Sequence, residues 1–412
     1  PDINREPTAP GAGAGQDPSR QFGFQRDDWY HRRGRITDYG QRDQVLMGDF
    51  PGGLKDLATE RDDVTAALTA VFARWIQAAD FDGFRIDTLK HIDHPFWESF
   101  APNIRKYAAG QITLADPTDQ GDPNKTVPPL TVPKNKFFMF GESFDGDDVL
   151  NGSYTFNQEV DSTFYFSQKF NVIDNVFKNN GPTQAIQDQF DRKMMDYAPT
   201  PNDNGIGVAP QNALVNFMDN HDVTRFLFDK PSTPALQNTL AYILTEDGIP
   251  CIYYGTEQEF NGGNDPTNRE RLWDTGFPTT GGTFQWIQKL IRVRKAYAPL
   301  RHGTMSLKWV TTHVAAEEDA GMVAYERTDG AHSMLVVLNT SDTQQSETSQ
   351  AKMGGSDMLT DFAPGQQLVD ILAAPGDATA TFTVGLQGAL NVPVPARGAR
   401  ILVPPADVVP LQ

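Results

Sequence analysis

Apolar residues recur from residue 62 to residue 79 at the spacing of one helical face, and a short apolar run follows at once. The stripe consists of Val64, Leu68, Val71, Phe72, Trp75 and Ile76. The same alternation of helical stretches and short apolar runs recurs along the chain. We expect further helices near 95–108, 183–195, 234–245 and 283–296, and strands at 83–87, 137–141, 160–166, 214–218 and 249–254. This alternation predicts a parallel α/β architecture.

The two ends of the chain do not follow this alternation of helices and strands. Residues 1 to about 50 are rich in Gly, Pro, Asp and Arg and show no sustained period, which is typical of an irregular, loop-rich region. After about residue 303, alternating runs such as 322–326 and 334–338 are separated by turn residues. This pattern predicts an all-β tail with the length of a sandwich domain.

Composition narrows the range of partners. The formal net charge is -18, so nucleic acid and anionic membrane surfaces would be repelled and are not expected as partners, whereas a neutral sugar polymer would not be repelled. No uninterrupted apolar stretch reaches the roughly 18 residues that a membrane span needs. Cys251 is the single cysteine, which excludes an intrachain disulfide or a Cys-based zinc site. We expect it to be a small buried residue on a strand.

Three acidic residues each stand at or just beyond the end of a short apolar, β-prone run. They are Asp87 at the end of 83–87, Glu142 at the end of 137–142 and Asp222 at the end of 217–222. A carboxylate in this place is where a barrel strand would expose it at the mouth of an active site. Arg85 precedes Asp87 by two residues, so on a strand both side chains point to the same face. Three such acids, with an Arg and a His beside them, indicate a glycosidase-like site.

These strings resemble conserved regions of the α-amylase family, glycoside hydrolase family 13. They occur in the family's order, segment 54–60 is similar to its Leu-Pro-Asp-Leu-Asn type segment, and 248–257 is similar to its last barrel strand. The resemblance implies a (β/α)8 TIM barrel with an irregular loop domain B and a C-terminal all-β sandwich. The expected domains are domain B at 1–60, the catalytic barrel at 61–302 and the sandwich at 303–412.

The expected barrel is incomplete within this sequence. Only five barrel-type strands can be counted, and an eight-stranded barrel needs three more. In the family, the first conserved region is an Asp-rich strand ending in Asn-His that precedes the loop-rich region. This sequence contains no such strand before its loop-rich region. We therefore expect this chain to hold barrel strands four to eight, and an N-terminal segment to complete the barrel.

The resemblance also implies roles for individual residues. It assigns Asp87 as nucleophile, Glu142 as proton donor and Asp222 as the acid that stabilises the oxocarbenium-like transition state. For a retaining enzyme we expect the Asp87 and Glu142 carboxyl groups to lie about 5 to 6 Å apart. Taken from the residues alone, each string has an ordinary structural reading as a salt bridge, a loop cap or a turn. The implied substrate-binding residues are Arg85, Lys90, His91, His221, Asp265, Arg269 and Trp273.

The resemblance implies a retaining glycoside hydrolase that cleaves α-1,4-glucosidic bonds in starch, glycogen or malto-oligosaccharides. The pair Lys90 and His91 favours α-1,4-glucan as substrate. A 4-α-glucanotransferase or cyclodextrin-forming transferase would use the same steps, although Lys55 stands where cyclodextrin-forming members carry an aromatic residue. A non-catalytic relative or an incomplete fragment is the alternative of another class. Because such a polymer is too large to import, we expect an extracellular location.

Calcium is the cofactor that the resemblance implies, since in much of the family the ion ties the loop domain to the barrel through hard oxygen ligands. Asp49 aligns with one Asp ligand, and His91 would contribute its backbone carbonyl. From the residues alone, Asp49 can equally be an exposed loop residue. Aromatic residues near the site are candidates to stack on sugar rings, and Trp273 is the strongest of them. The full set is Trp29, Tyr30, Tyr154, Phe156 and Trp273.

Overall fold

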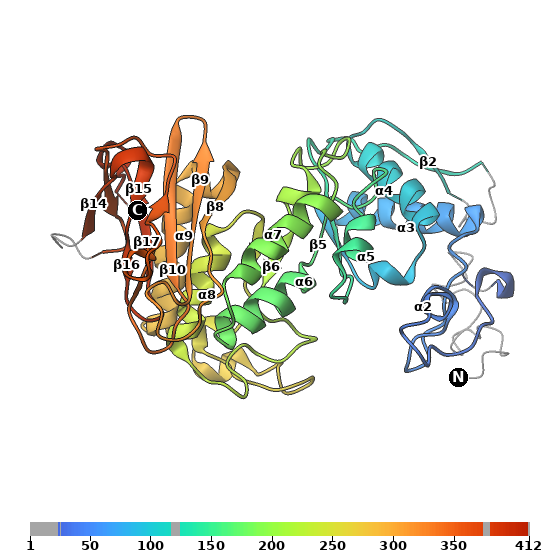
Figure 1. Cartoon of the computed structure of the whole chain (residues 1–412). Coiled ribbons are helices and arrows are strands. Elements are labelled where there is room, and N and C mark those ends of the chain that lie inside the picture. The colour runs from blue at the N-terminus through green and yellow to red at the C-terminus, as the bar shows by residue number, and fades with distance from the viewer. Residues whose placement is uncertain (1–23, 25, 117–123, 374–379, 411–412) are drawn as a thin grey trace. The chain divides into compact units, whose positions relative to one another are not determined.

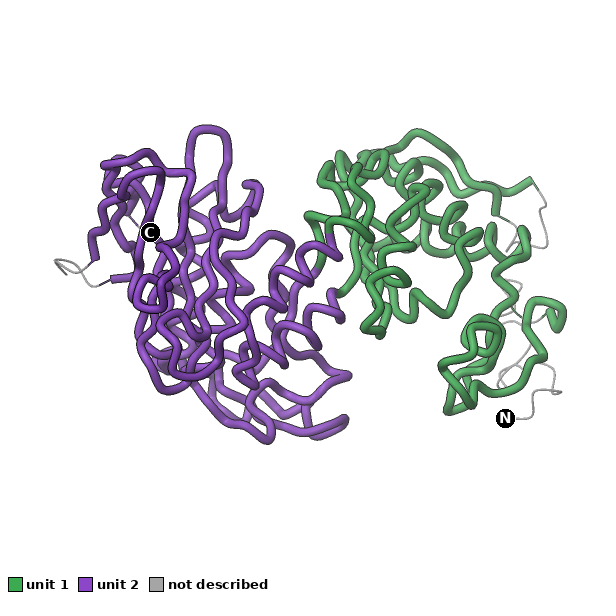
Figure 2. The backbone as a smooth tube through the Cα atoms, in the orientation of Figure 1, with its two compact units in different colours: residues 1–164, 194–214 green, residues 165–193, 215–412 purple. Residues whose placement is uncertain are grey.

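The computed structural model describes residues 24, 26–116, 124–373 and 380–410. Two compact units are distinguished in Figure 2. Unit 1 comprises residues 1–164 and 194–214, and unit 2 comprises residues 165–193 and 215–412, so the chain passes from one unit to the other three times. The first of these passages lies inside the segment 61–302. The domain boundaries expected at residues 60 and 302 stay a prediction.

Unit 1 contains short parallel strands and the helices that follow them (Figure 1). Strands β1, β4 and β5 form a parallel sheet in that order, with Ile86 of β1 opposite Gly141 of β4. Strands β2 and β3 form a separate antiparallel pair. The elements are η1 (Asp27–Trp29), α2 (Arg42–Met47), α3 (Asp62–Ala79), β1 (Gly83–Ile86), η2 (Leu89–His91), α4 (His94–Ala108), β2 (Leu114–Ala115), β3 (Thr126–Val127), β4 (Phe138–Gly141), α5 (Asp148–Ser153), β5 (Ser162–Thr163) and η4 (Pro210–Asn212).

Helix α3 occupies the range that the sequence predicts, but its buried face differs from the predicted stripe. Val64 and Ile76 are buried, whereas Phe72 and Trp75 are 39% and 55% exposed. Two acidic residues, Asp62 and Asp63, occupy its first turn, where negative charge favours the helix dipole. The helix stops at Ala79 because Asp80 adopts a left-handed backbone conformation, with φ at 58°. The face that it buries joins the aromatic residues of α4 in the core of unit 1. Members of this core include Ala70, Ala73, Ile76, Phe96, Trp97 and Phe100.

The segment 194–214 completes unit 1 although it is distant in sequence. The Tyr197 hydroxyl donates a hydrogen bond to Asp148 at 3.0 Å, and the Asn202 amide donates to the Val160 carbonyl at 3.1 Å. Asn202 also donates to the Asp161 carboxylate at 3.1 Å. These bonds are buried, so the segment belongs to the interior of the unit and not to its surface.

The described residues of the first part of unit 2 form two parallel strands and a series of helices. Strand β6 pairs with β7, with Val215 opposite Ile249, and helix α8 joins them. Ser232 caps α8 by accepting a hydrogen bond from the Ala235 backbone N–H. The elements are α6 (Phe166–Gln168), the π-helix η3 (Lys169–Lys178), α7 (Gln184–Asp196), β6 (Val215–Phe217), α8 (Thr233–Thr245), β7 (Ile249–Cys251), η5 (Thr256–Gln258), η6 (Leu272–Thr275), α9 (Gly282–Ala296) and α10 (Ala298–His302). The last turn of α7 falls in unit 1.

The rest of unit 2 is antiparallel β-structure. Six strands form one sheet in the order β14-β13-β17-β10-β9-β8, and two small sheets pair β11 with β16 and β12 with β15. Side chains alternate between two cores: Tyr325 and Val336 join the core of α8 and α9, whereas Ala324 and Leu335 join a second core with β12 and β15. The strands are β8 (Thr304–Trp309), β9 (Met322–Asp329), β10 (His332–Asn339), β11 (Ser346–Glu347), β12 (Met358–Leu359), β13 (Gln367–Asp370), β14 (Thr381–Thr383), β15 (Ala389–Leu390), β16 (Pro393–Val394) and β17 (Ala399–Val403).

The structure confirms the predicted helices and strands, with shorter strands at two places. The strands expected at 160–166 and 249–254 are β5 and β7, which are limited to 162–163 and 249–251. Cys251 lies on β7 as expected, but it is half-buried and not fully enclosed. No helix in the described part of the chain combines the length and the apolar character that a membrane crossing requires.

Candidate active site

One group of the predicted site residues lies at the ends of β1 and β4 in unit 1. Arg85 is on β1, and its Nη1 lies 2.9 Å from Oδ2 of Asp87, just beyond the strand. Its Nη2 lies 4.0 Å from Oε2 of Glu142. The Asp87 side chain is 67% exposed and that of Arg85 29% exposed. One guanidinium therefore faces both carboxyl groups, while the expected role of Arg85 in orienting a nucleophile stays a prediction.

Backbone hydrogen bonds fix Glu142 beside β1. Its N–H donates to the Ile86 carbonyl at 2.7 Å, and its own carbonyl accepts from the Leu89 N–H at 2.8 Å. The Thr88 N–H donates to Oε2 at 3.2 Å. Gly141 precedes it because a Cβ there would lie 2.4 Å from the Leu89 side chain, which packs against the strand end. The position of the Glu142 carboxyl group is thus set by two neighbouring segments.

The Glu142 carboxyl group is only 7% exposed, and this burial raises its pKa. A hydrogen bond with Asp87 raises the pKa further, while the Thr88 N–H lowers it. Such a group keeps its proton to higher pH than a free glutamic acid, as a proton donor must. The separation of about 5 to 6 Å expected between the carboxyl groups of a retaining pair stays a prediction.

Lys90 and His91 follow on the 3-10 helix η2 and point to partners within unit 1. Lys90 Nζ lies 2.8 Å from the Asp145 carboxylate and donates to the Phe144 carbonyl at 2.6 Å. The His91 ring lies with Nδ1 3.2 Å from the Val45 carbonyl, and burial lowers its pKa. Lys90 would have to exchange these partners to reach a sugar. Its expected role in substrate binding therefore stays a prediction.

Another group of the predicted site residues lies in unit 2, in the loop after β6. Asp222 Oδ2 is 3.0 Å from Nε2 of His221, and its Oδ1 is 3.9 Å from Nη2 of Arg269. Arg269 also meets Asp265, with Nε 2.6 Å from Oδ1. Trp273 lies nearby in sequence on η6, and 65% of it is exposed. The structure brings four of the predicted residues together here, while Asp87 and Glu142 are brought together in unit 1.

Comparison with known proteins identifies the family. A model of the α-amylase catalytic domain matches residues 15–276, which is more than half of the chain and includes all three acids. The chain belongs to the α-amylase family. It is 32% identical to a β/α-amylase of Paenibacillus polymyxa over 79% of the chain, and 29% identical to an α-amylase of Streptomyces lividans over 90% of it. It spans only 23% and 38% of the length of these two relatives.

Solved α-amylase structures resemble the chain as well. An Anoxybacillus α-amylase matches with a TM-score of 0.70 at 24% identity, over 92% of this chain and 71% of that one. An α-amylase from Malbranchea cinnamomea matches with a TM-score of 0.71 at 23% identity, over 94% of this chain and 70% of that one. At such identities the likeness shows the fold alone. The fold of this α-amylase family member is that of a TIM barrel with a domain B.

Two of the aromatic candidates for sugar stacking were wrong. Trp29 is 2% exposed and donates to the Asp63 carboxylate at 3.0 Å, and Tyr154 is completely buried. The Tyr154 hydroxyl accepts a hydrogen bond from Arg42 at 2.6 Å. Both rings fill the core. From one sequence, a buried aromatic residue cannot be distinguished from one that binds sugar. Trp273 is exposed and stays a candidate.

The surroundings of Asp49 fit a calcium ligand poorly. Its carboxylate is 3% exposed, and Lys55 Nζ lies 3.2 Å from Oδ2. Its Oδ1 accepts from the Asp56 N–H at 3.3 Å. A protein ammonium group thus already stands beside the carboxylate, and the described residues contain no group of three or more His, Cys, Asp or Glu that could hold a metal ion. No step of the chemistry below is routed through calcium.

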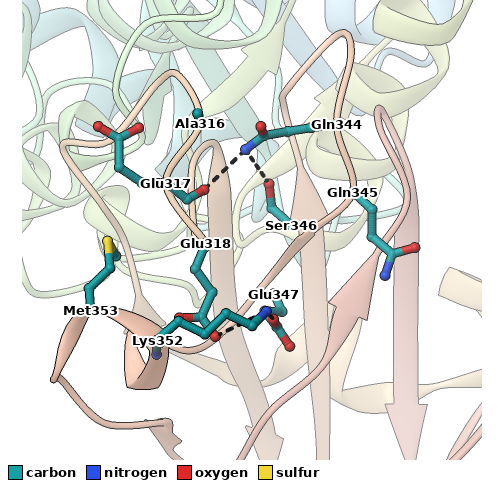
Figure 3. Close-up of a pocket in the computed structure, with 9 residues that line it drawn as sticks. All are labelled: Ala316, Glu317, Glu318, Gln344, Gln345, Ser346, Glu347, Lys352 and Met353. Atoms are coloured by element: carbon teal, nitrogen blue, oxygen red, sulfur yellow. Dashed lines mark hydrogen bonds and ion pairs between the residues drawn. The ribbon is translucent and has the colours of Figure 1, made fainter.

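A cavity of about 390 Å³ lies elsewhere, in the β-structure of unit 2 (Figure 3). Lys352 stands between the Glu318 and Glu347 carboxylates, and the Gln344 amide donates to the Glu317 carbonyl at 3.1 Å. Three glutamates and one lysine line this cavity, so its lining keeps an excess of acidic groups. None of the three acids of the α-amylase motifs lines it.

Sequence reasoning missed two buried residues that hold the Asp222 loop. Asn268 donates from its amide to three backbone carbonyls of that loop, and Arg225 pairs with Glu270 at 3.1 Å while its guanidinium lies 4.0 Å from the centre of the Tyr253 ring. Asn268 lies within the motif 265–270, yet nothing in one sequence separates it from a surface asparagine. Its burial is a property of the fold.

Proposed function

We propose that this α-amylase family member is a retaining glycoside hydrolase that cleaves α-1,4-glucosidic bonds in starch, glycogen or malto-oligosaccharides. The observation that carries the proposal is the buried Glu142 carboxyl group with its raised pKa, hydrogen-bonded to an exposed Asp87 that Arg85 holds. One carboxyl group is prepared to give a proton, and the other is prepared to attack. Both belong to the region that matches the catalytic-domain model.

The proposed reaction has two steps. Glu142 gives its proton to the glycosidic oxygen as that bond breaks, and Asp87 forms a bond to the anomeric carbon. Glu142, now a carboxylate, then takes a proton from water, which attacks the anomeric carbon and releases Asp87. Asp222 would stabilise the positive charge that develops on the sugar ring in each step. The proton that Glu142 loses in the first step is thus regained in the second.

Transfer to a sugar hydroxyl is the second candidate, because one relative is a cyclomaltodextrin glucanotransferase of Bacillus, 28% identical over 81% of this chain. The same two carboxyl groups would serve, with a sugar hydroxyl in place of water. Lys55 argues against cyclisation: it lies against Asp49 and is not a ring on which a glucan chain can wind. Transfer of a glycosyl group to the end of a linear glucan is therefore the transferase activity to test.

The deciding experiment is product analysis on maltoheptaose after an assay with soluble starch. Hydrolysis should release reducing ends in proportion to the bonds cut, and only products shorter than maltoheptaose should form. Products longer than the substrate would indicate transfer, and cyclic products would indicate cyclisation. If the wild-type protein is folded and still leaves both soluble starch and maltoheptaose intact, the hydrolase proposal is wrong. A non-catalytic relative is then favoured.

We infer that segment 61–302 supplies strands four to eight of the barrel. Five parallel strands occur among the described residues, and a barrel of this type has eight. At the edge strand β1, Phe72 and Phe81 contact Phe84 but remain 39% and 42% exposed. A further strand and helix would cover this apolar surface. Mass spectrometry of the natural protein should show more polypeptide than the 45.5 kDa of this sequence.

We also infer that residues 303–412 form a β-sandwich domain. The support is the alternation along β9 and β10, whose side chains belong to two separate cores on the two faces of one sheet. An expressed fragment of this segment that stays unfolded would show that the sheet depends on the helices α8 and α9. This outcome would make it a part of the barrel domain and not a domain of its own.

Calcium binding and an extracellular location complete the proposal. The burial of Asp49 supports a cation there, whereas Lys55 opposes it. A rise in the unfolding temperature with calcium, reversed by a chelator, would support an ion; no change in either direction would exclude it. The location follows from the size of the substrate alone. Fractionation of the native culture should find the activity outside the cells, and activity confined to the cells would contradict it.

A further inference from the structure

We propose that Asn268 is the positioning residue of Asp222, an inference that rests on the hydrolysis proposed above. Asn268 is completely buried in the loop after β7. Its Nδ2 donates to the carbonyl oxygens of Asn220 at 3.4 Å, His221 at 3.0 Å and Val223 at 2.8 Å. These carbonyls lie on both sides of Asp222 in the chain. One amide group therefore holds the backbone from which the Asp222 carboxylate projects.

The chemistry of the amide requires this orientation. Backbone carbonyls can only accept, so the nitrogen end of Asn268 must face them. An amide nitrogen carries two hydrogens, so the two shorter bonds, to His221 and Val223, use them best, and the longer contact to Asn220 shares one. An aspartate in the same place would turn an acceptor toward three acceptors. The position therefore needs a donor and not merely a side chain of this size.

The same loop segment is also tied from within and at its far end. Asn220 Oδ1 accepts from the N–H groups of Asp222 at 2.8 Å and Val223 at 3.2 Å, which closes a tight turn. At the far end, the Arg225 N–H donates to the Gly262 carbonyl at 3.1 Å. Loops 219–226 and 262–270 are thus joined at two separate points, and Asn268 provides the one beside the acid.

The far junction does not depend on Asn268. Glu270 accepts there from the Gly262 N–H at 2.6 Å and from Arg225 Nε at 3.1 Å, and the Arg225 guanidinium also donates to the Tyr254 carbonyl at 2.7 Å. Removing the Asn268 amide should therefore leave the two loops joined while freeing residues 220–223. We expect the Asp222 carboxylate to be held less precisely in place. A displacement of about 1 Å at a reacting group can cost roughly 100-fold in rate.

A double-mutant cycle tests whether Asn268 acts through Asp222. The values of kcat and KM on maltoheptaose are compared for the wild type, Asn268→Ala, Asp222→Asn and the double variant. Asn268→Ala should lower kcat by roughly 10- to 100-fold with a smaller change in KM, and Asp222→Asn by about 100- to 1000-fold. The double variant should be no slower than Asp222→Asn, because the positioned group is already gone. Asn264→Ala, an exposed position in the same loop, should match the wild type.

Four outcomes would count against the positioning role of Asn268 or against the hydrolase proposal on which it rests. Effects that multiply in the double variant, or a wild-type kcat for Asn268→Ala, would overturn the positioning role. Should Asn268→Ala not fold, as shown by circular dichroism, Asn268→Asp replaces it, and a kcat near the wild type for Asn268→Asp would leave a space-filling role only. Inactivity of the wild type itself would refute the hydrolase proposal, whereas an active wild type with multiplying effects refutes this inference alone.

Discussion

Glu142 in unit 1 and Asp222 in unit 2 are both acids after a barrel strand, yet their surroundings are opposite. Glu142 is 7% exposed and shares a hydrogen bond with another acid, which together with burial raises its pKa. The Asp222 side chain is 36% exposed and lies against two cation-forming groups, His221 and Arg269. The same kind of position thus yields a buried acid with a raised pKa in one unit and a more exposed acid beside basic side chains in the other. The neighbours of each acid, and not its place after a strand, make the difference.

Replacement of the donor should give the largest effect. Glu142→Gln keeps the size of the side chain but removes the transferable proton, so kcat on soluble starch should fall by roughly 100- to 10,000-fold, with substrate binding nearly unchanged. Reducing-end release and a binding titration with maltoheptaose measure the two quantities. Glu98→Gln, an exposed change on α4 of the same unit, should leave both unchanged. Near-normal turnover by Glu142→Gln would mean that the donor is another group.

The two arginines beside the acids allow a matched comparison. Arg85 contacts Asp87 at 2.9 Å and is 29% exposed, whereas Arg269 is 3.9 Å from Asp222 and 45% exposed. Arg85→Lys should therefore lower kcat by about 10- to 100-fold, because a lysine lacks the planar guanidinium whose two nitrogens face Asp87 and Glu142. Arg269→Lys should cost clearly less. Equal losses of kcat in the two variants would show that the closer contact and lower exposure of Arg85 make no difference to its role.

The pH dependence should reveal which acid is protonated. Because its pKa is raised, Glu142 keeps its proton above pH 4.5, and activity should fall as rising pH removes that proton. Asp87→Asn removes the hydrogen bond that raises this pKa, so Glu142 should then lose its proton at lower pH. Titration of the Glu142 side chain by ¹³C NMR in the two proteins measures the shift. An unchanged titration would remove Asp87 as a cause of the raised pKa.

A buried acid outside the site offers a control on burial itself. Glu246 is 2% exposed, and burial raises its pKa to about 8. An acid with a raised pKa in the folded state loses stability as pH rises, here between about pH 4.5 and pH 8, at about 1.4 kcal/mol per unit. Glu246→Gln should abolish this decline without changing kcat. Chemical denaturation at pH 5 and pH 8 measures it, and parallel curves for the two proteins would contradict the assignment.

The smallest effect is expected at Trp273. Its ring is 65% exposed, so Trp273→Ala should leave folding intact. Loss of a stacking surface for one sugar ring should raise KM by roughly 2- to 10-fold with kcat preserved. Trp29→Ala, in contrast, should destabilise the protein, because that ring is buried. If Trp273→Ala leaves KM unchanged for maltoheptaose, the platform role is excluded.

The sequence predicted the elements well because their signals are local. Helix α3 occupies the predicted range 62–79, since helical spacing is a local signal, but its buried face was predicted only in part: Phe72 and Trp75 of the expected stripe are exposed. The register that places Ile86 beside Gly141 depends on strand pairing and was not predictable from spacing, whereas the family resemblance already implied that Asp87 and Glu142 lie near one another. The inward direction of Lys90 and the burial of Asn268 depend likewise on segments distant in the chain.

Unit 1 is completed by the segment 194–214, which is synthesised after residues 165–193 of unit 2. Residues 165–193 belong to unit 2, and they emerge before Tyr197 and Asn202, which supply buried hydrogen bonds to the interior of unit 1. During synthesis, unit 1 must therefore wait, partly formed, while a part of its neighbour is already outside the tunnel. For the same reason a protease cannot release unit 1 with one cut: the polypeptide would have to be severed near 164, 193 and 214 alike.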